Sequence, residues 1–228
     1  MAASVYGVAD YCGGRATRSV SAMTVTFVGQ SAGLVMLLTF VLLSGVPVPP
    51  FSDFIWGGIA GIAGATGLLA FYKAMGSGYM TVVAPVSAVT ATAVPVVIGL
   101  MTGERPGILA LCGIPLALVA IALVSDVLGP NHRKAPRSIV VMAFLAGATF
   151  GSLFVILAHT NDDGGLWPVV AMRFTSIPYM AAVMFFMKRK PSEAKANLPF
   201  VLASGILDSV ANCLLYTSPS PRDRQKSR

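Results

Sequence analysis

Charged residues are scarce in this chain. Asp, Glu, Lys and Arg make up 11% of its 228 residues, against roughly 25% in an ordinary soluble domain. Hydrophobic residues make up 55%, and the mean hydropathy is +0.77. Because so few charges cannot cover the surface of a water-soluble domain of this length, the composition argues against a soluble protein.

Sequence signatures of catalytic and cofactor sites are also lacking. The chain has no GxxxxGK[ST] segment to hold phosphate, no HExxH to hold zinc, and no GxSxG to present a nucleophilic serine. Its three cysteines, Cys12, Cys112 and Cys213, are about a hundred residues apart and form no CxxC pair. We therefore predict a protein that is not an enzyme, that needs no cofactor or metal, and that is not driven by ATP.

What the chain does contain is a series of about eight apolar stretches joined by short polar hinges. A helix needs roughly 20 apolar residues to cross a hydrocarbon core about 30 Å thick, and lipid offers no partner for an exposed backbone N–H or C=O group. The sequence thus predicts an all-α integral membrane protein, a bundle of about eight transmembrane helices. The predicted spans are 1–14, 20–44, 54–75, 79–102, 106–125, 138–159, 166–187 and 198–212.

Turn-forming segments separate several of these spans, notably VPVPP at 46–50 and GSG at 76–78. Ten basic residues lie in the hinges after odd-numbered spans, whereas those after even-numbered spans hold only Arg105. Positive charge usually marks cytoplasmic loops, so we predict a multi-pass plasma-membrane protein whose first residues face outward. Basic residues placed beside spans also argue against a nucleic-acid partner, although the pI is about 9.6.

The second half of the chain echoes the first. Tyr6-Gly7 precedes Gln30 in the next span, and Phe150-Gly151 precedes Arg173 in the same relation. Five spans before the long polar segment at 125–138 is an odd number, so a second unit must cross the membrane in the opposite orientation. Inverted repeats of this kind are typical of secondary transporters, whose substrate site lies near the midplane between the repeats.

The end of the chain differs from the rest. Residues 213–228 read CLLYTSPSPRDRQKSR, with four basic residues and no apolar periodicity. This string resembles a sequencing adapter translated as protein. We therefore predict that the natural part of the sequence ends at Asn212, inside a span; a natural basic tail is the alternative.

Four segments resemble the EamA family of the drug/metabolite transporter superfamily: GVADYCGG at 7–14, AFYKAM at 70–75, VVAPVSAVTATAVPVVIGL at 82–100 and GERP at 103–106. The resemblance implies a ten-helix carrier made of two inverted five-helix repeats. It divides this chain into a first repeat at 1–125, a hinge at 126–137, a second repeat at 138–212 truncated in its third helix, and the tail at 213–228.

Few ionisable groups lie within the spans, and each is costly there, at about 2.5–3.5 kcal/mol for Asp, Lys or Arg at a helix centre. Such groups should face the interior of the bundle. Asp10, Gln30, Arg173 and Asp208 are therefore the leading candidates for binding substrate or a coupling ion. Two other interpretations stay open at this stage: Asp10 pairs with Arg15 near the membrane surface, or Arg173 extends to an interface.

Further candidates follow from the prolines of the fourth span. Pro85 removes a backbone hydrogen bond and bends its helix, so Pro85 and Ser87 are candidates to line a polar cavity, with a merely bent packing helix as the alternative. Tyr72 is a weaker candidate for the same pocket. A stripe of Gly57, Gly61, Gly64 and Gly67 predicts close packing against another helix of the same chain.

Taken together, these observations predict a secondary transporter that moves a small organic metabolite or drug-like molecule by alternating access, coupled to an ion. Its partners are the lipid bilayer and a small-molecule substrate, with no nucleic acid. The alternative from another class is a membrane scaffold or assembly protein that transports nothing, in which the buried charges only set helix registration.

Overall fold

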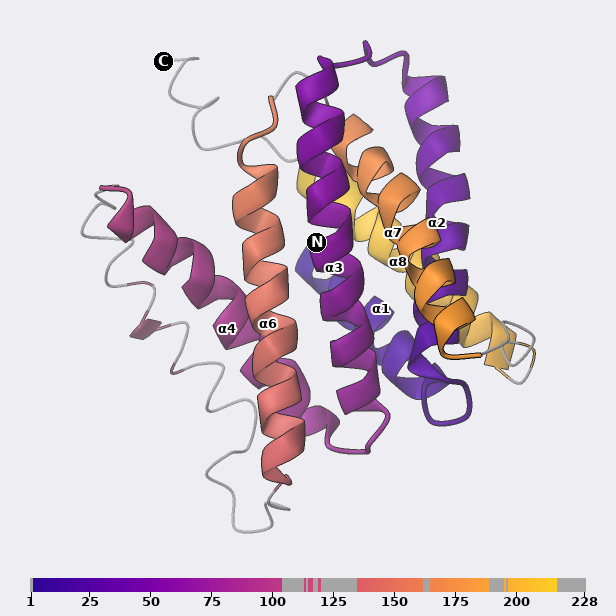
Figure 1. The fold of residues 1–228 in the computed structure, drawn as a ribbon, viewed down its shortest axis with the longest axis vertical. Coiled ribbons are helices and arrows are strands. Elements are labelled where there is room, and N and C mark those ends of the chain that lie inside the picture. Colours follow the sequence, from indigo (N-terminus) through magenta and orange to yellow (C-terminus); the bar gives the residue numbers. More distant parts are fainter. Residues whose placement is uncertain are drawn as a thin grey trace.

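A computed structural model describes residues 2–103, 113, 115, 116, 119, 135–161, 165–188, 195 and 197–216. This part of the chain is all-helical (Figure 1). Its seven helices are α1 (Ala2–Ala16), α2 (Ala22–Ser44), α3 (Phe51–Met75), α4 (Met80–Met101), α6 (Arg137–Leu157), α7 (Trp167–Phe186) and α8 (Leu198–Tyr216).

Each of these helices matches one predicted span, but the prediction of about eight transmembrane helices is confirmed only in part. Five helices are long and apolar enough to cross a membrane: α2, α3, α4, α6 and α7. Helix α1 has 15 residues, and the apolar part of α8, Leu198–Leu214, is also short. The predicted span at 106–125 falls outside the described residues, apart from 113, 115, 116 and 119.

Local chemistry explains where several helices begin and end. The Ser21 hydroxyl accepts a hydrogen bond from the Thr24 backbone N–H at 3.3 Å and caps the start of α2. Helix α2 ends at Gly45, which has φ +63°, and the reversal between α3 and α4 contains Gly78 at φ +88°. Residues with a side chain rarely adopt such φ values, so the turn predicted at 76–78 is confirmed.

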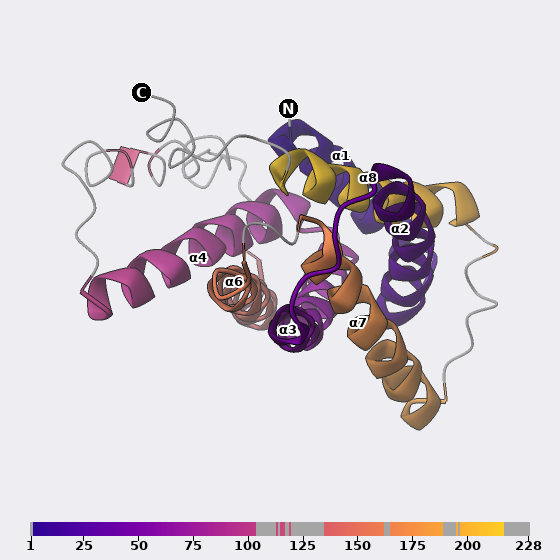
Figure 2. The same ribbon diagram turned by 90° about the horizontal axis from the view of Figure 1, so that it is seen from above.

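The helices pack in an open series of neighbours that does not follow chain order. Helix α1 packs on α8, α8 on α2, α2 on α7, α7 on α3, α3 on α6, and α6 on α4. Viewed from above, α4 lies at one end of this series and α1 lies beside α8 (Figure 2). Each of these contacts therefore joins a helix of the first half of the chain to a helix of the second half.

Small residues let the helices approach closely. A side chain on Gly57 or Gly61 of α3 would collide with the backbone of α7 at Pro168 or Met172. Further along α3, a side chain on Gly64 or Gly67 would collide with residues of α6. The predicted glycine stripe therefore packs within the chain. The crossing of α8 and α2 is equally tight, because a side chain on Gly205 would overlap the Gly29 carbonyl.

The two ends of the bundle are held by different contacts. Near the start of α3, Asp53 is fully buried, and its carboxylate accepts hydrogen bonds from the backbone N–H of Asn161 at 3.2 Å and from its side-chain amide at 2.9 Å. Near the start of α8, at the other end, the Asn197 amide donates one hydrogen bond to the Ser19 hydroxyl at 3.2 Å. Each contact joins the first half of the chain to the second.

Candidate functional site

A cavity of about 210 Å³ lies inside the bundle. All seven described helices contribute to its lining. The lining residues are Tyr6, Asp10, Gln30, Gly64, Leu68, Ala91, Phe150, Leu153, Phe154, Met172, Arg173, Asp208 and Asn212. Since an engineered cavity of about 150 Å³ holds benzene, this space is sufficient for a small organic molecule.

Arg173 and Asp208 form an ion pair at the cavity wall. The Arg173 side chain is 7% exposed and that of Asp208 is 26% exposed, so the carboxylate is the more accessible member of the pair. Asn212, one turn further along α8, also directs its amide to the Asp208 carboxylate, at 3.4 Å. Arg173 therefore does not extend to a membrane interface, and the interpretation that it does is wrong.

Gln30 connects the two halves of the chain at the same level. Its side-chain oxygen accepts a hydrogen bond from the hydroxyl of Ser176, one turn after Arg173 on α7. Both side chains are buried, with 3% of Gln30 and 2% of Ser176 exposed. The polar wall of the cavity is thus a connected set of groups from α2, α7 and α8.

Asp10 lies on α1 and faces the same cavity. It is partly buried, and among the described residues its carboxylate has no hydrogen-bond or ion-pair partner. Arg15 is exposed near the end of α1, and no ion pair joins it to Asp10. The structure therefore favours an acid directed into the bundle over an acid paired at the membrane surface.

The aromatic residues of the two predicted aromatic-glycine pairs meet at this cavity. Tyr6 of α1 and Phe150 of α6 both line it, together with Phe154. Leu68, Leu153 and Met172 add aliphatic surface. The cavity therefore combines one charged wall with an apolar and aromatic remainder, as is common in sites for small organic ligands.

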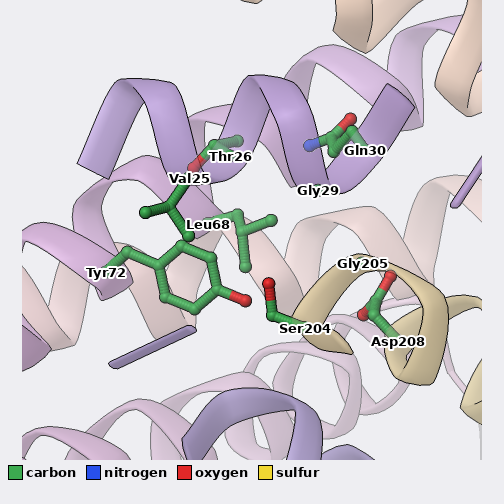
Figure 3. A pocket seen from close by; sticks show the side chains of 9 residues that line it. All are labelled: Val25, Thr26, Gly29, Gln30, Leu68, Tyr72, Ser204, Gly205 and Asp208. Atoms are coloured by element: carbon green, nitrogen blue, oxygen red, sulfur yellow. The ribbon is translucent and has the colours of Figure 1, made fainter. Parts of the chain in front are cut away.

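A much smaller space of about 10 Å³ adjoins the polar wall, and its lining is drawn in Figure 3. It has room for about one water molecule. Tyr72 lies here, with its hydroxyl directed toward Ser204 of α8, and Gln30 and Asp208 line both spaces (Figure 3). Tyr72 thus lies beside the main cavity but is not part of its lining.

The structure does not bring the α4 candidates into the cavity. Ser87 is 4% exposed and its hydroxyl donates to the Ala84 carbonyl at 3.0 Å. The Ser87 backbone packs so closely on Gly147 of α6 that a side chain there would collide with it. Pro85 is likewise absent from the lining, and Ala91 is the α4 residue that reaches it.

Sequence reasoning missed several residues of the polar network. Ser176 and Asn212 are small polar residues that follow Arg173 by three positions and Asp208 by four, which puts each on the same helix face as the charged residue. That spacing was a usable signal. Asp53 had no comparable signal, because its partner Asn161 lies 108 residues further along the chain.

Comparison with known proteins supports the resemblance seen in the sequence motifs. The family model described as EamA-like transporter family matches residues 1–126. No match was found among the curated proteins or among the solved structures. The matched family is one of transporters rather than enzymes.

Proposed function

The chain belongs to the EamA-like transporter family, and from this membership we propose that it is a secondary transporter moving a small organic metabolite or drug-like molecule by alternating access. As a multi-pass membrane protein it works in a lipid bilayer, which we propose is the plasma membrane. We further propose that transport is coupled to an ion gradient, with a proton as the first candidate.

The cavity among the seven helices is the observation that carries this proposal. Charged groups are expensive inside a membrane and mark substrate or ion pathways. Here Asp10, Arg173 and Asp208 come from three different helices and face one space. A scaffold would gain nothing from keeping an open cavity between its buried charges.

The pattern of helix contacts supports an inverted repeat. An inverted repeat would exchange α1 with α6, α2 with α7 and α3 with α8. Under this exchange the α3–α6 pair corresponds to the α8–α1 pair, and the α3–α7 pair corresponds to the α8–α2 pair. The α2–α7 pair becomes itself. All three resulting pairs are in contact, which supports our proposal that an axis relating the two halves passes between α2 and α7, beside Gln30 and Ser176.

The contacts at the two ends obey the same exchange. The start of α3 and the segment after α6, joined through Asp53 and Asn161, correspond to the start of α8 and the segment after α1, joined through Asn197 and Ser19. Alternating access requires that one end opens while the other closes. We propose that these contacts are the two gates, the Asp53 gate being stronger because the buried Asp53 carboxylate accepts two hydrogen bonds from Asn161.

The exchange also bears on the proposed division into repeats at 1–125 and 138–212. Under this exchange, the contact between α4 and α6 would correspond to a contact between α1 and a further helix of the second repeat. On α6, Gly151 packs against α4 at Ala91 and Val94, whereas Gly7 of α1 has nothing within 4 Å. We propose that the natural second repeat supplies a helix to the face of α1 at Gly7.

This proposal is tested by sequencing the source gene across the Asn212 codon with a method that uses no sequencing adapter resembling residues 213–228. A codon sequence that continues into an apolar span supports the proposal, and a natural CLLYTSPSPRDRQKSR ending contradicts it.

The function is tested with the full-length protein that carries this sequence, reconstituted in lipid vesicles. Under an imposed pH gradient, at least one member of a broad panel of small metabolites should move across the membrane. Asp10→Asn, Asp208→Asn and Arg173→Met should each abolish this movement in protein that inserts normally. If no panel member moves, the transporter proposal fails, and if the variants lose folding alone, the buried charges serve registration as in a scaffold.

A further inference from the structure

The charges at the cavity do not balance. Three ionisable side chains of opposite sign line it: the carboxylates of Asp10 and Asp208 and the guanidinium of Arg173. Arg173 and Asp208 neutralise one another in an ion pair. With both acids ionised, the side chains that line the cavity therefore carry a net charge of −1, and this charge resides on Asp10.

This balance selects among the possible charges of a ligand. An anion would enter a space that already holds two carboxylates, and Arg173, the one basic residue among the described residues of the lining, is paired with Asp208. A zwitterion would need that ion pair broken to free Arg173 for its carboxylate. A cation with a single charge satisfies Asp10 and disturbs nothing, and in a partly dehydrated site such a pair is stronger than in water.

The rest of the lining defines the body of the ligand. The rings of Tyr6, Phe150 and Phe154 surround the space from α1 and α6. Aromatic faces attract organic cations and also cover apolar groups. Met172 adds a flexible side chain that adapts to differently shaped apolar ligands. A volume of about 210 Å³ limits the ligand to roughly one aromatic ring with a short side chain.

We infer that this cavity binds a small organic monocation with an apolar or aromatic body, whose charged nitrogen pairs with the Asp10 carboxylate. The inference rests on the proposed transport function and names the substrate class for the same site. Asp10 is then the binding residue for the charge, and the Arg173–Asp208 pair shapes the wall beside it.

Four probes with one ring and different charge test the inference: 2-phenylethylamine as cation, 2-phenylethanol as neutral, phenylacetate as anion and phenylalanine as zwitterion. Their binding to purified full-length protein in lipid nanodiscs is measured by equilibrium dialysis at pH 7.5. The amine should bind at least about tenfold more tightly than the other three, because a hydrogen bond to a charged group is stronger than one between neutral groups.

Variants locate the charge. Asp10→Asn should weaken binding of the amine at least about tenfold and leave binding of the neutral alcohol unchanged, whereas Asp10→Glu should retain the preference for the cation. Lys73→Gln removes a charge from an exposed position outside the cavity and should leave the preference intact. Preference for the anion or zwitterion, or an unchanged amine affinity in Asp10→Asn, overturns the inference.

The two proposals fail differently. Suppose that vesicles with the full-length protein move a neutral or anionic metabolite, but the amine binds no more tightly than the other three probes. The proposed substrate class is then wrong, and the transporter function stands. If nothing moves in the vesicle assay and the amine still binds through Asp10, the site is correct and the transport proposal is wrong.

Discussion

The ion pair between Arg173 and Asp208 makes a sharp prediction about stability. Its partners are unequally buried, with side-chain exposures of 7% for Arg173 and 26% for Asp208. Asp208→Asn leaves a buried guanidinium without its counterion, whereas Arg173→Met leaves a carboxylate that still reaches the cavity. We therefore expect the aspartate variant to be the less stable of the two.

The size of the effect follows from the burial. Removing one partner of a buried pair costs about 3–5 kcal/mol, whereas an exposed pair is worth about 0–1 kcal/mol. Because Asp208 is a quarter exposed, we expect about 3 kcal/mol for Asp208→Asn and about 1–2 kcal/mol for Arg173→Met. The double variant should recover most of the lost free energy of unfolding, because neither charge is then left without its partner. The double-mutant cycle should give a coupling energy of about 1–3 kcal/mol between the two residues.

These differences are measured by thermal unfolding of the purified full-length proteins in detergent. Size-exclusion chromatography of the heated samples detects how much protein is still folded. About 3 kcal/mol corresponds to a fall in Tm of roughly 6–12 °C. Lys73→Met is the matched control: it also replaces a basic residue on a helix, but Lys73 is exposed, so the change should stay within about 0.5 kcal/mol. Two single variants whose effects simply add in the double variant would refute the ion-pair reasoning.

Two further predictions concern the contacts that hold the helices together. Asn161→Ala removes the side-chain amide from the buried Asp53 carboxylate and should lower the free energy of unfolding by about 1–3 kcal/mol, whereas Ser52→Ala, which removes only a marginal 3.4 Å contact to the same carboxylate, should have little effect in the same melting assay. Gly205→Ala places a methyl group against the Gly29 carbonyl and should cost at least about 1–3 kcal/mol; a Tm equal to that of the unmodified protein would contradict the close crossing of α2 and α8.

Much of the site was predictable because charged residues are rare within the apolar stretches of this chain. Asp10, Arg173 and Asp208 stood out against long apolar runs, and all three line the cavity. Pro85 and Ser87 were candidates for a different reason, since a proline was expected to expose polar backbone. The sequence of α4 does not indicate which of its faces packs on another helix. In the structure, Ser87 lies on the face that packs against Gly147 of α6.

The ion-pair partner of Arg173 was also beyond sequence reasoning. Arg173 and Asp208 are 35 residues apart and Gln30 and Ser176 are 146 apart, so each pairing depends on how the helices cross. The interpretation that Arg173 extends to an interface failed on this point. Its position six residues into α7 permits that orientation, but Asp208 of α8 supplies a carboxylate to it in the interior.

The sequence by itself determined the class of this protein, the positions of the described helices and their polar residues, because the length and apolarity of a helix are local properties that lipid selects directly. Only the tertiary structure decided which helices are neighbours, since many pairings of apolar helices bury similar surface and the choice depends on where small residues such as Gly29 and Gly205 permit close approach. That choice brings seven helices around one cavity and leaves Asp10 there without a counterion among the described residues.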